Sequence, residues 1–216
     1  PSSAYAVMLS GLGLIAMCFL LSFRNTGEKV SIAAMFVIAG TCWLGWSLFA
    51  GNLLLATKGV NGVIAQLVAD WTSSGFVWMW LVPVSLGSAY FVIPKVTGEP
   101  IFSGPLGRGC FWLYIFVAGL TGSARLAGGP IPVWLSSLSA SAAILLLVPV
   151  VGSIYNLIAS GRGSRRTANS PSARFTIFGL GIFLSAVLLN AVGSLRSVHY
   201  MVQFTLFDSG VAALVL

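Results

Sequence analysis

Few side chains in this sequence ionise at neutral pH. Among 216 residues there are four Asp and Glu, eleven Lys and Arg and one histidine, so only 7% are charged while 57% are hydrophobic. This composition excludes an ordinary soluble globular domain. The sequence also lacks a P-loop, a GxSxG element and a GxGxxG turn that opens a helix after a strand. Nucleotide-binding and serine-hydrolase sites of these kinds are therefore excluded.

Cysteine is scarce as well. Cys18, Cys42 and Cys110 all lie inside apolar segments and form neither a CxxC pair nor a Cys/His spacing of the kind that binds zinc. We expect small buried hydrophobic side chains at these positions, with no disulfide and no zinc.

Long apolar runs are what the sequence does contain. A helix needs ~20 apolar residues to cross a bilayer, and hydrocarbon offers its backbone no hydrogen-bond partner. The runs predict an all-α fold, a polytopic membrane helix bundle that forms one domain over residues 1–216. A seventh helix is expected to start at Ser209. The six full transmembrane helices that we expect are Ala4–Phe23, Ile32–Ala56, Val63–Ile93, Leu106–Ala127, Val133–Ala159 and Phe175–Gly193. The first run has no basic region before it and no cleavage site after it, so we expect a true span.

Two prolines, Pro83 and Pro149, fall near the middle of expected spans. Proline removes a backbone donor, so we expect a kink at each, with the freed carbonyls taken up by neighbouring helices or by Ser and Thr hydroxyl groups.

Basic residues are shared unevenly between the connectors. The second, fourth and sixth connectors hold only Lys58, Arg125 and Arg196. The first, third and fifth hold Arg24, Lys29, Lys95, Arg108, Arg162, Arg165, Arg166 and Arg174. The positive-inside rule then places the odd connectors in the cytoplasm and the N-terminus outside. Because the charges are dispersed among loops, lipid is the expected surrounding and nucleic acid is not an expected partner.

Five ionisable residues fall on or near the outward ends of the expected helices: Asp70, Arg125, Arg196, His199 and Asp208. Charges at membrane depth are costly and are usually paired. Two interpretations stay open, solvation at the interface or an internal ion-pair cluster that joins Asp70 or Asp208 to Arg125 or Arg196. A lone histidine cannot form a metal site, which needs three or four converging ligands.

The stretch from Gly87 to Trp134 carries a recognisable pattern. It contains GSAYFVIPKVTGEPIFS (Gly87–Ser103), FW (Phe111–Trp112) and GGPIPVWLSSLS (Gly128–Ser139), and Pro149, Asn156, RF (Arg174–Phe175) and FT (Phe204–Thr205) follow. This pattern resembles the catalytic subunit of cbb-type cytochrome c oxidases, in the haem-copper oxidase superfamily. The resemblance covers residues 63–216, whereas residues 1–62 match by position only.

The resemblance implies positions for five metal-binding histidines, three for copper and two for haem iron. Counting from the flanking motifs, these positions hold Ser74, Ala124, Arg125, Val211 and Ala213. None is a histidine. The resemblance therefore implies a degenerate relative with no haem or copper of its own, these cofactors being expected only in partner subunits. Arg125 is then expected to pair with Asp208 or Asp70 in the vacated space.

These inferences favour an accessory, non-catalytic membrane subunit of a respiratory electron-transfer complex, in the inner membrane of a bacterium. Its partners would be other membrane subunits of that complex. Two alternatives remain: a catalytic haem-copper oxidase or nitric oxide reductase subunit, and a membrane transporter or channel.

Overall fold

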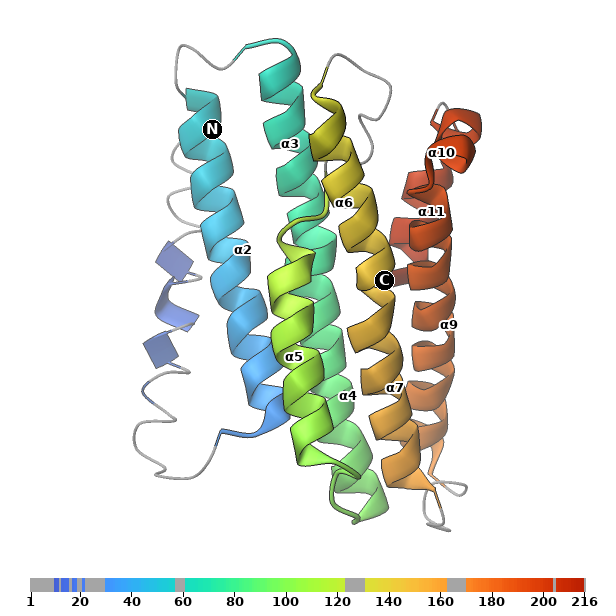
Figure 1. The fold of residues 1–216 in the computed structure, drawn as a ribbon. Coiled ribbons are helices and arrows are strands. Elements are labelled where there is room, and N and C mark those ends of the chain that lie inside the picture. The colour runs from blue at the N-terminus through green and yellow to red at the C-terminus, as the bar shows by residue number, and fades with distance from the viewer. Residues whose placement is uncertain are drawn as a thin grey trace.

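The computed structural model describes residues 30–56, 61–122, 131–162, 170–203 and 205–215, with scattered positions between residues 10 and 21. Within these residues the fold is a bundle of roughly parallel and antiparallel helices with no strand, as the apolar runs predicted (Figure 1). Most of the expected span Ala4–Phe23 lies outside the described residues.

Four helical stretches in the described residues are long and apolar enough to cross a membrane. They are α2 (Ile32–Ala56), the run Val63–Thr97, the run Val133–Gly161 and α9 (Pro171–Gly193). The run Val63–Thr97 comprises α3 (Val63–Gly75), the π-helix η1 (Phe76–Leu81) and α4 (Val82–Thr97), and the run Val133–Gly161 comprises α6 (Val133–Leu145) and α7 (Leu147–Gly161). A fifth span would result if α10 (Arg196–Val202) and α11 (Phe207–Val215), which are bent by 103° relative to each other, count as one.

The expected span Leu106–Ala127 is shorter in the structure. Helix α5 (Gly104–Ala118) has 15 residues, and the chain turns at Gly119 and Leu120. At ~1.5 Å per residue a helix of this length falls short of the ~30 Å hydrocarbon core. Residues 123–127 lie outside the described part.

Capping residues explain why α9 begins earlier, and α4 ends later, than the sequence predicted. Helix α9 begins at Pro171 because Ser170 accepts a hydrogen bond from the Ala173 amide at 3.4 Å and proline suits the first turn. Helix α4 continues past Pro94 to Thr97 and is capped by Gly98, whose φ of 74° is the left-handed conformation typical of a helix C-cap.

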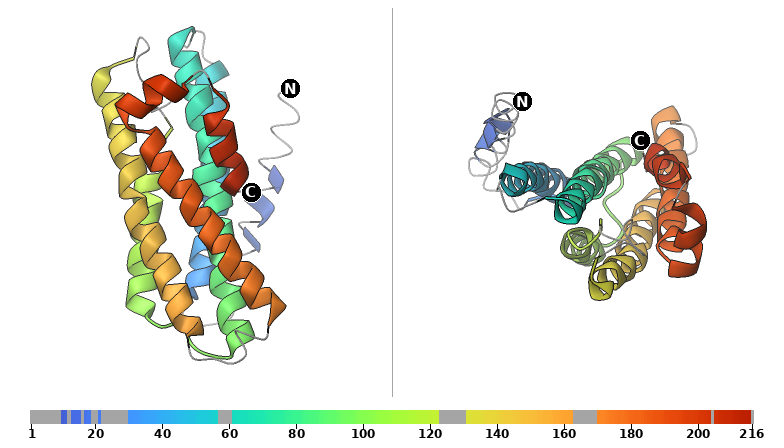
Figure 2. Two further views of the ribbon diagram at one scale, coloured as in Figure 1. Left: turned by 90° about the vertical axis from the view of Figure 1, so that its right-hand side faces the viewer. Right: turned by 90° about the horizontal axis from the view of Figure 1, so that it is seen from above.

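Helix α4 lies at the centre of the bundle. It contacts α2, α7 and α9, and the view along the bundle in Figure 2 shows it between α2 and the pair α9 and α11. Its Tyr90 stacks on Phe36 of α2 with ring centroids 5.7 Å apart, and Phe36 also meets Phe111 of α5 edge-on at 5.1 Å. All three rings are at most 5% exposed. These aromatic contacts join three helices into one core.

The expectation of buried cysteines is correct for Cys110 and wrong for Cys18 and Cys42, which are exposed. An exposed side chain on a membrane-spanning helix meets hydrocarbon, where a thiol is as well tolerated as in a protein core. Apolar sequence alone cannot separate these two environments.

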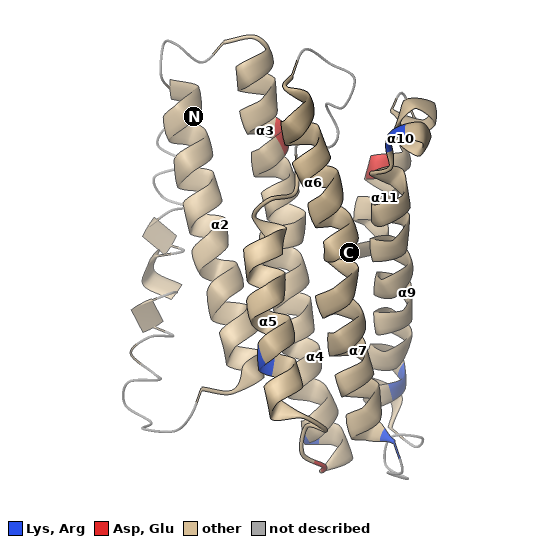
Figure 3. Cartoon of the chain, viewed as in Figure 1, with Lys and Arg blue, Asp and Glu red and all other residues tan. Residues whose placement is uncertain are grey.

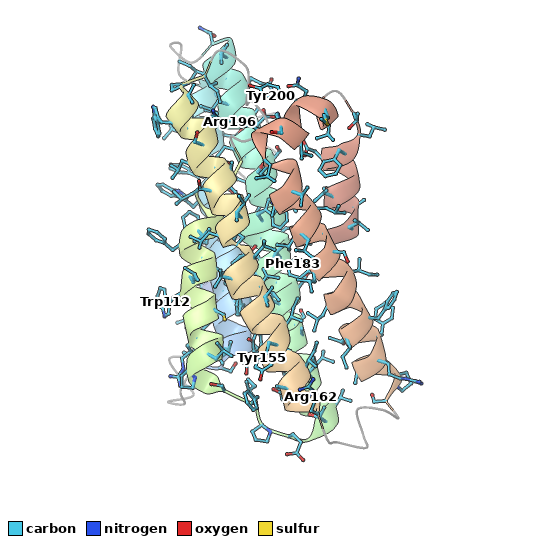
Figure 4. All side chains as sticks on the ribbon, turned by 45° about the vertical axis from the view of Figure 1, so that its right-hand side comes forward. Trp112, Tyr155, Arg162, Phe183, Arg196 and Tyr200 are labelled. Carbon is cyan, nitrogen blue, oxygen red and sulfur yellow. The ribbon has the colours of Figure 1, made fainter. Side chains whose placement is uncertain are left out.

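Charged side chains lie at the two ends of the bundle. Lys95, Arg108, Arg162 and Arg174 lie at or next to the ends of α4, α5, α7 and α9, which meet at one end, as the blue segments of Figure 3 show. Between the two ends the helices carry apolar surface. Trp112 and Tyr155 project from it, 65% and 53% exposed (Figure 4).

Candidate functional site

A small polar cavity of about 30 Å³ lies where α3, α6, α9, α10 and α11 come together. Its polar side chains come from all of these helices and from the turn after α5, and they are Ser74, Thr121, Ser139, Asn190, Ser194, His199 and Asp208. Trp78 and Ala143 complete the wall. We call this space the polar cavity.

Ser74, one of the five expected ligand positions, lies at the α3 side of the polar cavity and is only 3% exposed. The turn after α5 passes directly over it. A Cβ at Gly122 would lie 3.2 Å from the Ser74 Cβ and 3.2 Å from the Trp71 Cα, and Gly122 has a φ of 119°. Glycine is required here both by the close approach and by the positive φ.

A hydrogen bond holds this turn in place. The indole Nε1 of Trp71 donates to the Gly119 carbonyl at 3.3 Å. This turn contributes Thr121 to the lining of the polar cavity.

Asp208 reaches the polar cavity because α11 folds back onto α9. The ring of Phe207 occupies the space where a Cβ of Gly193 would lie, so the glycine allows the two helices to touch. Asp208, the next residue, is half-buried and lines the polar cavity in the first turn of α11. Acidic side chains in the first turn of a helix interact favourably with its dipole.

His199 is the buried ionisable residue of the site. It lies in α10, is 5% exposed and lines the polar cavity. Its Nε2 atom is fully buried and has no hydrogen-bond partner among the described residues. A buried polar nitrogen without a partner costs free energy, so it calls for an explanation.

The other charged residues of the expected cluster lie elsewhere. Arg196 is exposed at the start of α10, where its Nη2 donates to the Ser137 hydroxyl at 2.6 Å; Figure 4 shows it near Tyr200, at the end of the bundle away from Arg162. Asp70 is half-buried on α3 and accepts a hydrogen bond from Gln66 at 3.1 Å. Arg125 lies outside the described residues. Of the cluster, the structure brings His199 and Asp208 to one cavity.

The remaining expected ligand positions are separate from the polar cavity or outside the described residues. Val211 is 5% exposed and belongs to the hydrophobic core, and Ala213 is exposed. Ala124 follows Gly122 by two residues and is not described. The residue of α11 that lines the polar cavity is Asp208.

The donors around the polar cavity do not fit a haem iron beside a copper ion. Copper in proteins is bound mainly by imidazole and thiolate groups, and haem iron needs an axial ligand such as histidine. The cavity offers one imidazole, one carboxylate, hydroxyl groups and an amide. Since His199 is the single histidine of the chain, it cannot serve both metals.

A second polar cluster, whose contacts the sequence did not predict, fixes the opposite end of the bundle. Asn156 of α7 is fully buried; its Oδ1 accepts from the Ser103 amide at 2.9 Å and its Nδ2 donates to the Ser103 carbonyl at 3.0 Å. Ser160 accepts from the Phe102 amide at 2.9 Å. These bonds attach the connector between α4 and α5 to α7. The only signal in the sequence was an asparagine inside an apolar run.

Comparison with known proteins gives one family. Residues 3–210 match the family model described as Cytochrome C and Quinol oxidase polypeptide I. Cytochrome c oxidase subunit 1 of Rhodobacter capsulatus is 24% identical over 192 residues, which are 88% of this chain and 34% of that protein. The Cbb3-type cytochrome c oxidase subunit CcoN1 of Stutzerimonas stutzeri is 24% identical over 145 residues, 67% of this chain and 31% of that protein.

This chain thus spans about a third of the length of the curated relatives that it matches. The family match confirms the resemblance inferred from the motifs between Gly87 and Trp134, including its cbb-type character. The chain belongs to the cytochrome c and quinol oxidase polypeptide I family.

Proposed function

We propose that this chain is a non-catalytic member of its family and acts as an accessory membrane subunit of a respiratory electron-transfer complex. It keeps the helix packing of an oxidase subunit but binds neither haem nor copper. Any haem or copper of the complex would be held by partner subunits.

The observation that carries this proposal is the polar cavity. Ser74 lies there at an expected copper-ligand position, and the cavity has hydroxyl groups, an amide and one carboxylate around a single imidazole. A dioxygen-reducing site needs a haem iron with an open coordination position and a second metal nearby. These donors provide neither.

The surface supports a role within a larger membrane assembly. Trp112, Phe116, Phe175 and Leu206 are 65% to 82% exposed, and such side chains are stable only against lipid or another apolar helix. We propose other membrane subunits of a respiratory complex as partners. The basic end of α4, α5, α7 and α9 would face the cytoplasm of a bacterium, and the N-terminus would lie outside.

The experiment is purification of the affinity-tagged chain from its native membranes in mild detergent, followed by mass spectrometry of the proteins that co-purify. A reproducible set of oxidoreductase subunits in fixed ratio supports the proposal. Recovery of the chain alone, with oxygen or nitric oxide reduction by the purified chain, would contradict it. The control is an unrelated membrane protein of similar size that carries the same tag.

A further inference from the structure

We propose that the polar cavity is an internal water site, in which about two water molecules link His199 of α10 to the hydroxyl groups of α3, α9 and the turn after α5. The inference rests on the proposed absence of a metal from this cavity. It adds a ligand and a structural role to a site for which the family comparison gives neither.

The size of the polar cavity suits water. Its volume is about 30 Å³, and a buried water molecule needs on the order of 10–15 Å³ of such space and two to four polar partners. Empty cavities in proteins are apolar, whereas this one has polar side chains on several helices. A haem or an organic ligand would not fit this volume.

The hydrogen-bonding groups that line the polar cavity also favour water as its occupant. Thr121 donates its hydroxyl hydrogen to the Ala118 carbonyl at 2.8 Å, and Ser194 donates to the Asn190 carbonyl at 2.7 Å. Both hydroxyl groups therefore offer only acceptor lone pairs to the cavity, and the carboxylate of Asp208 is an acceptor as well when ionised. These acceptors favour an occupant that donates hydrogen bonds, as a water molecule does.

The buried Nε2 of His199 also favours a water molecule in the polar cavity. Its Nε2 is buried and has no partner among the described residues, and in a neutral imidazole this nitrogen is either a donor or an acceptor. Water can satisfy both tautomers, since it donates and accepts. A water molecule at Nε2 removes the cost of the unpaired nitrogen and connects α10 to the neighbouring helices that line the cavity.

Because His199 is the single histidine of the chain, it can be observed without assignment. We would label the full chain with ¹⁵N-histidine, reconstitute it in phospholipid bilayers and record water-edited solid-state NMR spectra. We expect rapid magnetisation transfer from water to Nε2 although the side chain is buried. A histidine signal that is sharp but receives no transfer, or an Nε2 bonded directly to another side chain, would overturn the water site.

Two variants serve as controls. The double variant His199→Phe with Tyr200→His moves the histidine to a position that is 56% exposed in the wild type and should show strong transfer. Ala143→Val adds volume to the wall of the polar cavity, so it should displace water, reduce the transfer to His199 several-fold and lower the Tm by about 2–4 °C. Unreduced transfer in Ala143→Val, or a raised Tm, would place the water elsewhere and contradict the proposal.

The same spectra distinguish a failure of the water site from a failure of the proposed function. Paramagnetic broadening of the His199 signal together with haem absorbance would show a metal next to the cavity and overturn the proposed function. A diamagnetic chain without haem and without water transfer would overturn the water site alone.

Discussion

The hydroxyl of Tyr114 on α5 donates a hydrogen bond of 2.5 Å to the backbone carbonyl of Trp78 in the π-helix η1. In the π register the Val82 amide donates to the Val77 carbonyl, five residues earlier. The next amide in that register would be that of Pro83, which has no N–H, so the Trp78 carbonyl loses its helical partner. Tyr114 supplies the missing donor from a neighbouring helix, as the sequence led us to expect for a carbonyl freed by this proline.

Replacing this donor should destabilise the bundle. Tyr114→Phe keeps the buried ring but leaves the Trp78 carbonyl unpaired, which should cost about 1–3 kcal/mol of unfolding free energy. The measurement is thermal unfolding in mild detergent. Tyr155→Phe is the control, because Tyr155 is 53% exposed and should change stability by less than about 0.5 kcal/mol. Equal stability of the two variants would contradict this role of Tyr114.

Asn156 should hold the connector between α4 and α5. Asn156→Leu removes the acceptor of the Ser103 amide and the donor to its carbonyl, and should cost about 1–3 kcal/mol. Hydrogen exchange at the Ser103 amide should accelerate more than exchange in α7. Asn52→Leu is the matched control, since Asn52 donates to Leu48 of its own helix and not to a connector that the structure describes. An unchanged exchange rate at Ser103 would show that the connector is held by other contacts.

The close approach of α2 to α4 should depend on Gly87. A Cβ at this position would lie 2.8 Å from the Ala33 carbonyl oxygen and 2.8 Å from Val37, so Gly87→Ala must push the two helices apart. We expect a loss of about 1–3 kcal/mol, as for other overpacked sites. Gly179→Ala should be neutral or stabilising by up to about 1 kcal/mol, because a Cβ there would meet nothing within 4 Å. A reversed order of the two melting temperatures would contradict this packing.

Arg125 and Asp208 should form an ion pair, which remains a proposal since Arg125 lies outside the described residues. Asp208 lines the polar cavity together with Gly122, three residues before Arg125. A double-mutant cycle of Arg125→Gln and Asp208→Asn should give a coupling of about 0.5–3 kcal/mol. The same cycle with Arg196→Gln should give none, because Arg196 bonds to Ser137 instead. Coupling of Arg125 to Asp70 alone would contradict the pairing with Asp208.

The sequence predicted most of the fold because each apolar run must form its own hydrogen bonds in a bilayer. The expected span Ile32–Ala56 coincides with α2 residue for residue. The end of α5 at Ala118 was not predicted, because the residue types that follow it at Gly119, Thr121 and Gly122 also occur within transmembrane helices. The π-helix before Pro83 was also missed; the proline indicated a distortion there but not its type.

The candidate site was predicted in part. Counting from the flanking motifs identified Ser74, and the structure places this residue in the lining of the polar cavity. The burial of His199 could not be predicted from the sequence, because it depends on how the short helix α10 packs against α9. Long-range contacts of this kind decide which charged residues line the cavity: Asp208 does, whereas Arg196 is exposed and bonds to Ser137.

The central claim is that this member of the oxidase family binds no haem. The most direct test is the dithionite-reduced minus oxidised absorbance spectrum of the chain purified free of partner subunits, with haem and copper quantified per chain. We predict less than about one haem or copper per ten chains, because one imidazole cannot supply the ligands of both metals. A stoichiometric haem signal that His199→Gln abolishes would contradict the account.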